Sequence, residues 1–85
     1  MQEQITLYSA AMCSDCQKLK NFMVDRGITF ELRDIKENPE YADEVRQNTG
    51  KLGVPYLVID GEWVRGYELD KPFSEEFAES LFKRE

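Results

Sequence analysis

The sequence predicts a small α/β fold whose elements follow the order β-α-β-α-β-β-α. The chain has 85 residues, of which 41% are hydrophobic and 33% charged, and this composition is typical of a globular domain spanning residues 1–85. Short β-branched and aromatic segments alternate with segments whose apolar residues recur at helical spacing. The dipeptide Asp60-Gly61 separates two of the short segments and favours a tight antiparallel hairpin.

The first half of the chain is predicted to form a β-α-β unit. Ile5–Tyr8 is short, β-branched and aromatic, which indicates a buried strand. A helix is expected from Ser14 to the stop at Gly27, because apolar residues recur at helical spacing at Cys16, Leu19, Phe22 and Met23. Residues 28–35 alternate apolar and polar side chains and predict a second, half-buried strand.

The second half is predicted to add a helix, a hairpin and a last helix. Asn38-Pro39 favours a helix start and Gly50 its end. Tyr56–Ile59 and Glu62–Arg65 would form the hairpin around Asp60-Gly61. The last helix carries an apolar stripe, which we interpret as core rather than as a cofactor site, at Phe73, Phe77, Ala78, Leu81 and Phe82.

Charge and hydropathy exclude several functional classes. The net charge of -6 would repel a phosphate backbone, so nucleic acid is not an expected partner. No apolar run reaches the ~20 residues of a membrane span. The N-terminal residues show neither the basic flank nor the hydrophobic stretch of a secretory signal. These features predict a cytoplasmic monomer that does not associate with membranes.

The chain has two cysteines, Cys13 and Cys16, separated by two residues. They could form a structural disulfide, a metal site or a redox pair. A disulfide that closes so short a loop adds little stability, and cytosolic chains rarely keep permanent disulfides. Zinc takes four ligands, whereas this chain has no histidine and no third cysteine. The spacing therefore favours a redox pair, and no metal is expected.

Position on the predicted helix assigns different roles to the two cysteines. Cys13 would lie at the helix N-terminus, where free amides and the helix dipole stabilise a thiolate. Cys16 lies one turn later on the apolar face and should be more enclosed. We expect Cys13 to attack and Cys16 to resolve the mixed disulfide. Asp15 opposes this activation, because a nearby carboxylate disfavours a second negative charge.

The segment Gly53-Val54-Pro55 comes directly before the hairpin. A proline at the start of a strand marks an edge or a special turn, because proline cannot donate to a strand ladder. An ordinary turn proline is one interpretation. In the other, a cis Val54-Pro55 bond leaves the backbone of Val54 free to pair with a peptide or thiol substrate.

Over nearly its whole length the chain resembles the glutaredoxin family. The resemblance is carried in order by Leu7-Tyr8-Ser9, Cys13-Ser14-Asp15-Cys16, Gly53-Val54-Pro55, Asp60-Gly61 and Arg65-Gly66-Tyr67. It implies a thioredoxin-like fold, with a four-stranded mixed sheet flanked by three helices. It also implies thiol-disulfide oxidoreductase activity, a cis-proline at Pro55, and glutathione as the reductant or as half of a mixed disulfide.

The same resemblance implies a glutathione site. Its residues would be Val54, Pro55, Lys51 for the glycine carboxylate, and Gly66, Tyr67 and Glu68 for the γ-glutamyl end. Three positions depart from the family pattern: Ala10 replaces a cation, Arg65 replaces the first glycine of a pair, and Leu69 replaces an aspartate. Asp70 is either a displaced substitute for that aspartate or a cap for the last helix before Lys71-Pro72.

Two alternatives to a glutathione-dependent reductase of protein disulfides remain open at this point. The stretch from Gly66 to Lys71 also resembles redoxins that serve ribonucleotide reductase and are recharged by thioredoxin reductase. Some glutaredoxins instead bridge a [2Fe–2S] cluster between two subunits, for which Cys13 could supply a ligand. We favour glutathione, because one missing charge-assisted contact costs only about 1.5–3 kcal/mol.

Overall fold

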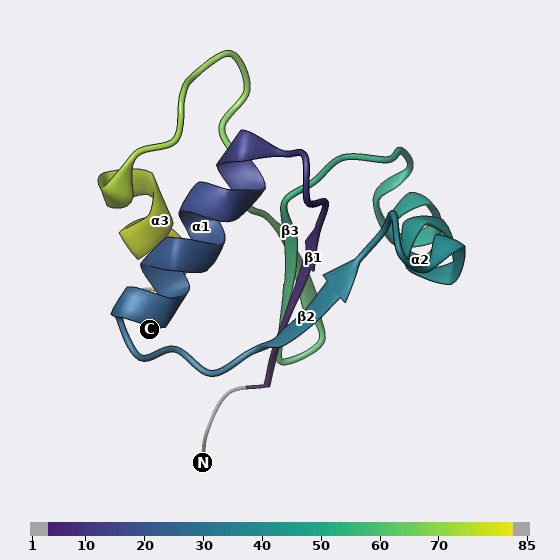
Figure 1. Cartoon of the computed structure of the whole chain (residues 1–85), viewed down its shortest axis with the longest axis horizontal. Helices are drawn as coiled ribbons and strands as arrows, with labels where there is room; N and C mark the ends of the chain where they lie inside the picture. Colours follow the sequence, from purple (N-terminus) through teal and green to yellow (C-terminus); the bar gives the residue numbers. More distant parts are fainter. Residues whose placement is uncertain (1–3, 83–85) are drawn as a thin grey trace.

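The computed structural model, which describes residues 4–82, has a four-stranded mixed sheet with helices on both faces (Figure 1). The elements are β1 (Ile5–Ser9), α1 (Ser14–Asp25), β2 (Glu31–Asp34), α2 (Pro39–Thr49), β3 (Tyr56–Ile59), β4 (Glu62–Arg65) and α3 (Glu75–Phe82). The strand order is β2-β1-β3-β4, with β1 parallel to β2 and the other pairs antiparallel. The predicted element order and fold class are confirmed.

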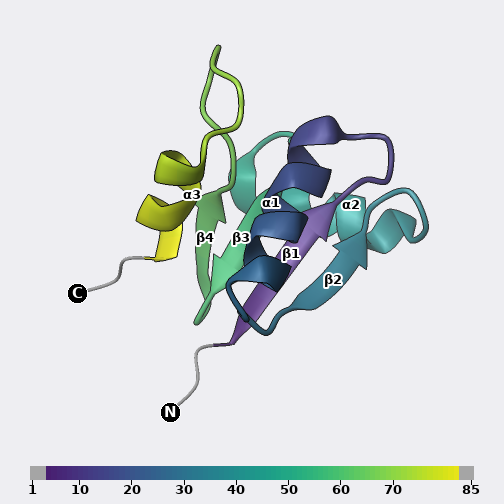
Figure 2. The same ribbon diagram turned by 60° about the vertical axis from the view of Figure 1, so that its left-hand side comes forward.

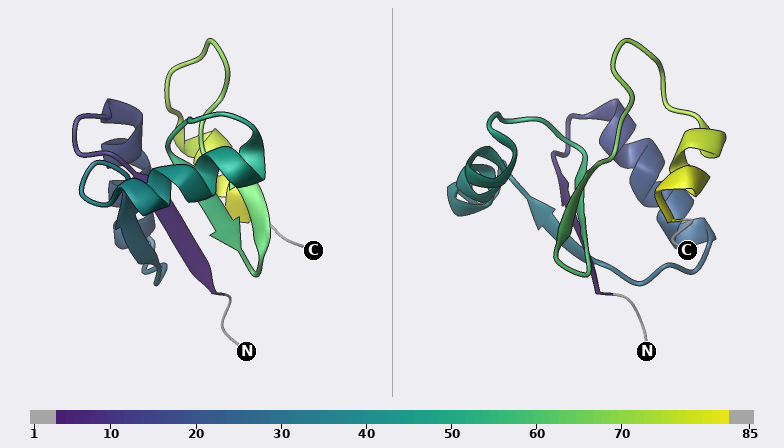
Figure 3. Two further views of the ribbon diagram at one scale, coloured as in Figure 1. Left: turned by 90° about the vertical axis from the view of Figure 1, so that its right-hand side faces the viewer. Right: turned by 180° about the vertical axis from the view of Figure 1, so that it is seen from behind.

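The helices cover the two faces of the sheet unequally. Helices α1 and α3 lie together on one face and α2 lies alone on the other (Figures 1 and 2). A view from behind and one from the α2 side show the same arrangement (Figure 3). Strand β1 lies in the interior of the sheet, and a short loop at its C-terminal end leads directly into α1.

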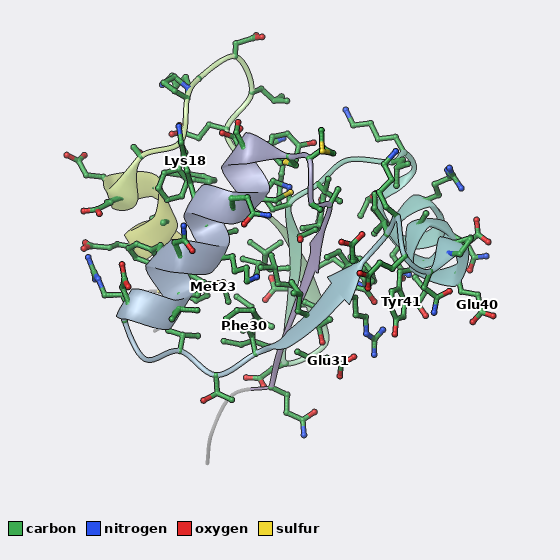
Figure 4. All side chains as sticks on the ribbon, in the orientation of Figure 1. Lys18, Met23, Phe30, Glu31, Glu40 and Tyr41 are labelled. Atoms are coloured by element: carbon green, nitrogen blue, oxygen red, sulfur yellow. The ribbon has the colours of Figure 1, made fainter. Side chains whose placement is uncertain are left out.

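Each face of the sheet has its own hydrophobic cluster. The cluster under α1 and α3 includes the fully buried side chains of Leu7, Leu19 and Met23. Figure 4 shows Met23 and Phe30 on this side of the sheet and Tyr41 on α2 across it. The cluster under α2 centres on Tyr8 and Val45. Successive side chains of β1 point to opposite faces, so Leu7 joins one cluster and Tyr8 the other.

Several predicted boundaries are confirmed by local geometry. The Asn38 side chain accepts a hydrogen bond from the Glu40 N–H at 3.1 Å, and Pro39 is the first residue of α2. Gly50 ends α2 with a φ of 88°. At the hairpin, Asp60 and Gly61 both have positive φ, which matches the twist of antiparallel strands.

Strand β2 is shorter than the prediction of residues 28–35. Only Glu31–Asp34 pairs with β1, and its first partner is Thr6, the second residue of β1. Residues before Glu31 therefore have little of β1 beside them with which to form a ladder. The apolar side chains of Ile28 and Phe30 still pack against the core, which explains the alternating pattern without a strand.

The last helix also begins later than its apolar stripe predicts. Phe73 precedes α3 and packs against the core from a loop. The Ser74 hydroxyl accepts a hydrogen bond from the Phe77 N–H at 3.2 Å and so caps the helix. The expectation that Asp70 caps this helix is wrong, because Asp70 lies in the preceding loop with a φ of 61°.

Candidate active site

Cys13 is the N-cap of α1, directly after the loop that follows β1. Its backbone is extended, and the Cys16 N–H donates a hydrogen bond to the Cys13 Sγ at 3.2 Å. The Cys13 N–H donates to the Ala10 carbonyl at 3.1 Å, which fixes the loop. Sulfur therefore takes the place of the usual side-chain oxygen at a helix N-terminus, where free N–H groups stabilise negative charge.

Cys16 differs sharply from Cys13 in exposure. Both thiols are free of disulfides, but Cys16 is fully buried whereas Cys13 is partly exposed. Burial raises the pKa of the Cys16 thiol, and its hydrogen bond to Cys13 raises it further. The two sulfurs thus meet the geometric requirements for an exposed attacking thiol and an enclosed second thiol one helical turn away.

The loop before β3 faces the Cys13 sulfur. The Val54-Pro55 peptide bond is cis, as the family resemblance implies. The Val54 carbonyl oxygen lies 3.9 Å from the Cys13 Sγ, and Pro55 is fully buried below it. These contacts place an extended backbone segment beside the exposed thiol. Such a segment can pair with the backbone of a substrate that carries a disulfide.

Gly66, in the loop after β4, contacts the loop before β3. Its N–H donates to the Pro55 carbonyl at 3.0 Å. A Cβ at Gly66 would lie 2.9 Å from the Leu19 Cδ2 and 3.0 Å from the Pro55 oxygen. The position therefore requires glycine for close approach. Sequence reasoning named Gly66 only as a glutathione contact, because the approach of Leu19 and Pro55 arises from the tertiary fold.

Tyr67 lies against the loop before β3. A Cβ at Gly53 would come within 2.7 Å of the Tyr67 hydroxyl, so the phenol end of Tyr67 covers Gly53. Arg65 supports Tyr67, because its Nε donates to the Tyr67 carbonyl at 2.9 Å and its guanidinium lies 5.5 Å from the ring centroid. The loop after β4 is thereby tied to the Gly53-Val54-Pro55 segment.

The structure brings some of the predicted site residues together and leaves others apart. Val54, Pro55, Gly66 and Tyr67 belong to one set of connected loops beside Cys13. The other three, Lys51, Glu68 and Asp70, form no hydrogen bond or ion pair with them. Lys51 is exposed in the loop after α2, Asp70 is exposed in the middle of the loop after β4, and Glu68 faces Lys71 at 3.9 Å.

Apolar exposure is the feature of this region that sequence reasoning missed. Five large hydrophobic side chains in the described part of the chain are exposed. Three of them lie on connected loops at the end of the sheet near Cys13: Met12 precedes Cys13, Leu52 is in the loop before β3, and Leu69 is in the loop after β4. Leu69 was singled out as a replaced aspartate. Exposure itself depends on how the loops fold, and no pattern in the sequence predicts it.

Among residues 4–82 there is no group of three or more histidine, cysteine, aspartate or glutamate side chains that could hold a metal ion. The same residues contain no helix long and apolar enough to cross a bilayer.

Comparison with known proteins gives one consistent family. The model of the glutaredoxin family matches residues 5–64. The chain is 30% identical over 70 residues to an uncharacterised glutaredoxin-like 8.6 kDa protein of the rubredoxin operon of Clostridium pasteurianum, covering 79% of this chain and 93% of that protein. It is 26% identical over 70 residues to glutaredoxin 3 of Escherichia coli K12, covering 78% of this chain and 84% of that protein.

A solved structure extends the likeness to the three-dimensional fold. The glutaredoxin-like protein NrdH-redoxin from Escherichia coli, described as having a thioredoxin-like activity profile, matches with a TM-score of 0.71 and 24% identity. The match covers 96% of this chain and 99% of that chain. At this identity the similarity shows the thioredoxin-like fold.

Proposed function

The chain belongs to the glutaredoxin family of thiol-disulfide oxidoreductases, and we propose that it reduces protein disulfides and glutathione mixed disulfides through Cys13 and Cys16. One observation carries this proposal. The partly exposed Cys13 sulfur accepts the Cys16 N–H at 3.2 Å and faces the Val54 carbonyl, while the Cys16 thiol is buried one turn below. A single chain therefore holds both thiols that the reaction needs.

The reaction would proceed in two exchanges. The Cys13 thiolate attacks one sulfur of the substrate disulfide, the substrate S–S bond breaks, and the departing thiolate takes a proton. Cys16 then loses its proton and attacks the Cys13 sulfur, which releases the second substrate thiol. The substrate gains two electrons and two protons, and the protein is left with a Cys13–Cys16 disulfide.

We propose glutathione as the source of electrons that restores the dithiol, in the cytoplasm, where glutathione keeps thiols reduced. The Val54 backbone beside Cys13 supports this proposal, because it can pair with the cysteine backbone of an extended tripeptide. The exposed ammonium of Lys51, which forms no ion pair with any residue that the structure describes, is available to a carboxylate. Tyr67 and Glu68 would border the γ-glutamyl end, with Asp70 nearby.

A second candidate is a redoxin that thioredoxin reductase recharges and that serves ribonucleotide reductase. The observation that favours it is the loop after β4. Leu69 is exposed where the family pattern places an aspartate, and the Glu68 carboxylate faces Lys71. The likeness to NrdH-redoxin extends over nearly the whole length of both chains.

A coupled assay separates the two reductants. NADPH consumption is followed while the protein reduces a mixed-disulfide substrate, with either glutathione and glutathione reductase or thioredoxin reductase present. Turnover with glutathione alone supports our proposal. Turnover with thioredoxin reductase alone would overturn the glutathione assignment and leave the dithiol chemistry standing. Visible absorbance after anaerobic purification, with no disulfide reduction, would instead indicate [2Fe–2S] carriage.

A further inference from the structure

Met12, Leu52 and Leu69 are exposed apolar side chains on the three loops at the reactive end of the molecule, and we call these three residues the apolar rim. Their side chains are 93%, 43% and 55% exposed, respectively. Met12 directly precedes Cys13, Leu52 is two residues before Val54, and Leu69 is two residues after Tyr67. These positions are far apart in the sequence, and the loops that carry them lie at one end of the sheet (Figures 1 and 2).

Contacts between the loops hold the rim together. The Cys13 sulfur faces the Val54 carbonyl at 3.9 Å, and the Gly66 N–H binds the Pro55 carbonyl at 3.0 Å. The Tyr67 hydroxyl covers Gly53, which follows Leu52 directly. The three loops that carry the rim are thus tied to the backbone segment at which a substrate would pair.

A single exposed apolar side chain is ordinary on a protein surface, but several beside a reactive group mark an interaction site, because they leave water only when a partner covers them. Glutathione offers two carboxylates, an ammonium and no apolar side chain beyond its cysteine, so it cannot cover the rim. Near Leu69, the Glu68 carboxylate faces the Lys71 ammonium, which reduces the net charge beside the apolar group. These properties suit an uncharged apolar partner.

We propose that the rim of Met12, Leu52 and Leu69 selects protein disulfides whose cysteine is flanked by apolar residues in an extended segment. This inference rests on the proposed dithiol reduction and names its substrate class. The segment would pair with the Val54 backbone while its apolar side chains cover the rim. Cys13 then attacks the disulfide, and the exchange with Cys16 follows as described above.

The test uses two synthetic peptides of equal net charge, each with one cysteine in a mixed disulfide with 2-mercaptoethanol. In one peptide the residues around the cysteine are leucine, and in the other they are serine. The reduced protein is mixed with excess peptide, the reaction is quenched with acid, and the released peptide thiol is quantified by mass spectrometry. We expect the leucine peptide to react about tenfold faster, which corresponds to about 1.4 kcal/mol.

Variants assign this preference to the rim. We expect Met12→Ser, Leu52→Ser and Leu69→Ser in one chain to reduce the ratio of the two rates to near one. Val24→Ser and Leu32→Ser are matched controls, because both side chains are exposed, at 59% and 43%, and lie on α1 and β2 away from the rim. The controls should keep the wild-type ratio.

The outcomes distinguish the two proposals. If both peptides react at equal rates and Cys13→Ser does not react, the proposed role of the rim is overturned. The proposed dithiol reduction is then still supported. No reduction of either peptide by the wild-type protein would overturn the proposed function itself. A preference that survives the triple substitution, or that the Val24→Ser and Leu32→Ser controls also lose, would show that other apolar surface is responsible.

Discussion

The contrast between Cys13 and Cys16 is set by one helical turn. Cys13 comes before the first turn of α1, at its edge, whereas Cys16 is on the face that α1 packs onto the sheet. The spacing predicts this difference, because Cys16 and Leu19, three residues apart within the helix, share its buried side, whereas Cys13 precedes the helix. What the spacing could not predict is the 3.9 Å approach of the Val54 carbonyl, which depends on a loop 41 residues away.

Substitution separates the two thiols functionally. We expect Cys13→Ser to abolish all thiol exchange, because no other exposed thiol is present. Cys16→Ser should retain activity on glutathione mixed disulfides and lose reduction of protein disulfides, since a second glutathione can replace the missing resolving thiol only for the former. Steady-state rates with both substrates measure the split. If Cys16→Ser alone abolished both activities, the two roles would be reversed.

Tyr8 provides a prediction about alkaline pH. Its hydroxyl donates to Glu44 and accepts from Arg33, and its side chain is buried. Burial, followed by the hydrogen bond to Glu44, raises the pKa of Tyr8 from its ordinary value of 10.0 to about 12. The folded state therefore holds this proton more tightly than the unfolded state. The resulting stability is fully present below pH 10 and is lost as the pH rises toward 12.

We expect the unfolding free energy to fall by about 1.4 kcal/mol per pH unit in that window because of Tyr8 alone. Urea unfolding at several pH values measures the slope, and Tyr8→Phe serves as the comparison because Arg33 and Glu44 still pair with each other at 2.9 Å. Burial also raises the pKa of Cys16, which adds a decline common to both proteins. Identical slopes in the two proteins would refute the role of Tyr8.

Among the elements, the loop after β4 depends most on close packing. We expect Gly66→Ala to lower the unfolding free energy by about 1–3 kcal/mol and to slow disulfide reduction, because its methyl group would collide with Leu19 and the Pro55 carbonyl. Gly53→Ala is the matched variant, since the three atoms nearest to its methyl group all belong to the side chain of Tyr67. Chemical unfolding and steady-state assays compare them. A Gly66→Ala variant that is as stable and active as the wild type would show that the loop can move to accommodate the methyl group at no cost.

Adding Tyr67→Phe to Gly53→Ala sharpens the comparison. Loss of the hydroxyl removes the nearest atom to the new methyl group, so the double variant should regain much of any lost stability. No such relief exists for Gly66→Ala, where one of the two obstructing groups is backbone.

Local signals predicted element boundaries well only where the cap is itself a sequence motif. Asn38-Pro39 and Gly50 mark α2 because a side-chain acceptor, a missing N–H and a positive φ are properties of single residues. Strand β2 and helix α3 were predicted too long at their N-terminal ends. Phe30 and Phe73 pack against the core from outside regular structure, so their apolar character indicated burial and not conformation.

At the scale of the whole molecule, two hydrophobic clusters share one sheet. Trp63, the single tryptophan, stacks on Tyr8 in the cluster beneath α2, with 5.1 Å between ring centroids. Met23 is fully buried in the cluster on the opposite face. Since β1 and β3 contribute to both clusters, we expect neither cluster to persist without the other.

Met23→Ala tests this coupling. Truncating a buried methionine should cost about 2–5 kcal/mol. The unfolding midpoint should shift by the same amount whether it is followed by Trp63 fluorescence or by far-ultraviolet circular dichroism. This holds although Trp63 lies across the sheet from the substitution. A fluorescence midpoint that stays at the wild-type value while the dichroism midpoint falls would show that the faces unfold independently.

The order of the elements along the chain could be predicted, because the connections are short and the elements follow the pattern of a β-α-β unit and a later hairpin. The resemblance to a known family implied a four-stranded mixed sheet, but the strand order β2-β1-β3-β4 was not predicted, since periodicity does not show which strands are neighbours.

The start of β1 and the β3–β4 turn meet at the end of the sheet opposite Cys13 (Figure 1). There the Gln4 N–H donates to the Asp60 carboxylate at 2.9 Å, and the Asp60 N–H donates to the Gln4 carbonyl at 2.9 Å. A polypeptide joined ahead of Gln4 therefore departs from the pole farthest from the chemistry. In such a fusion the added chain would begin at the opposite end of the sheet from Cys13.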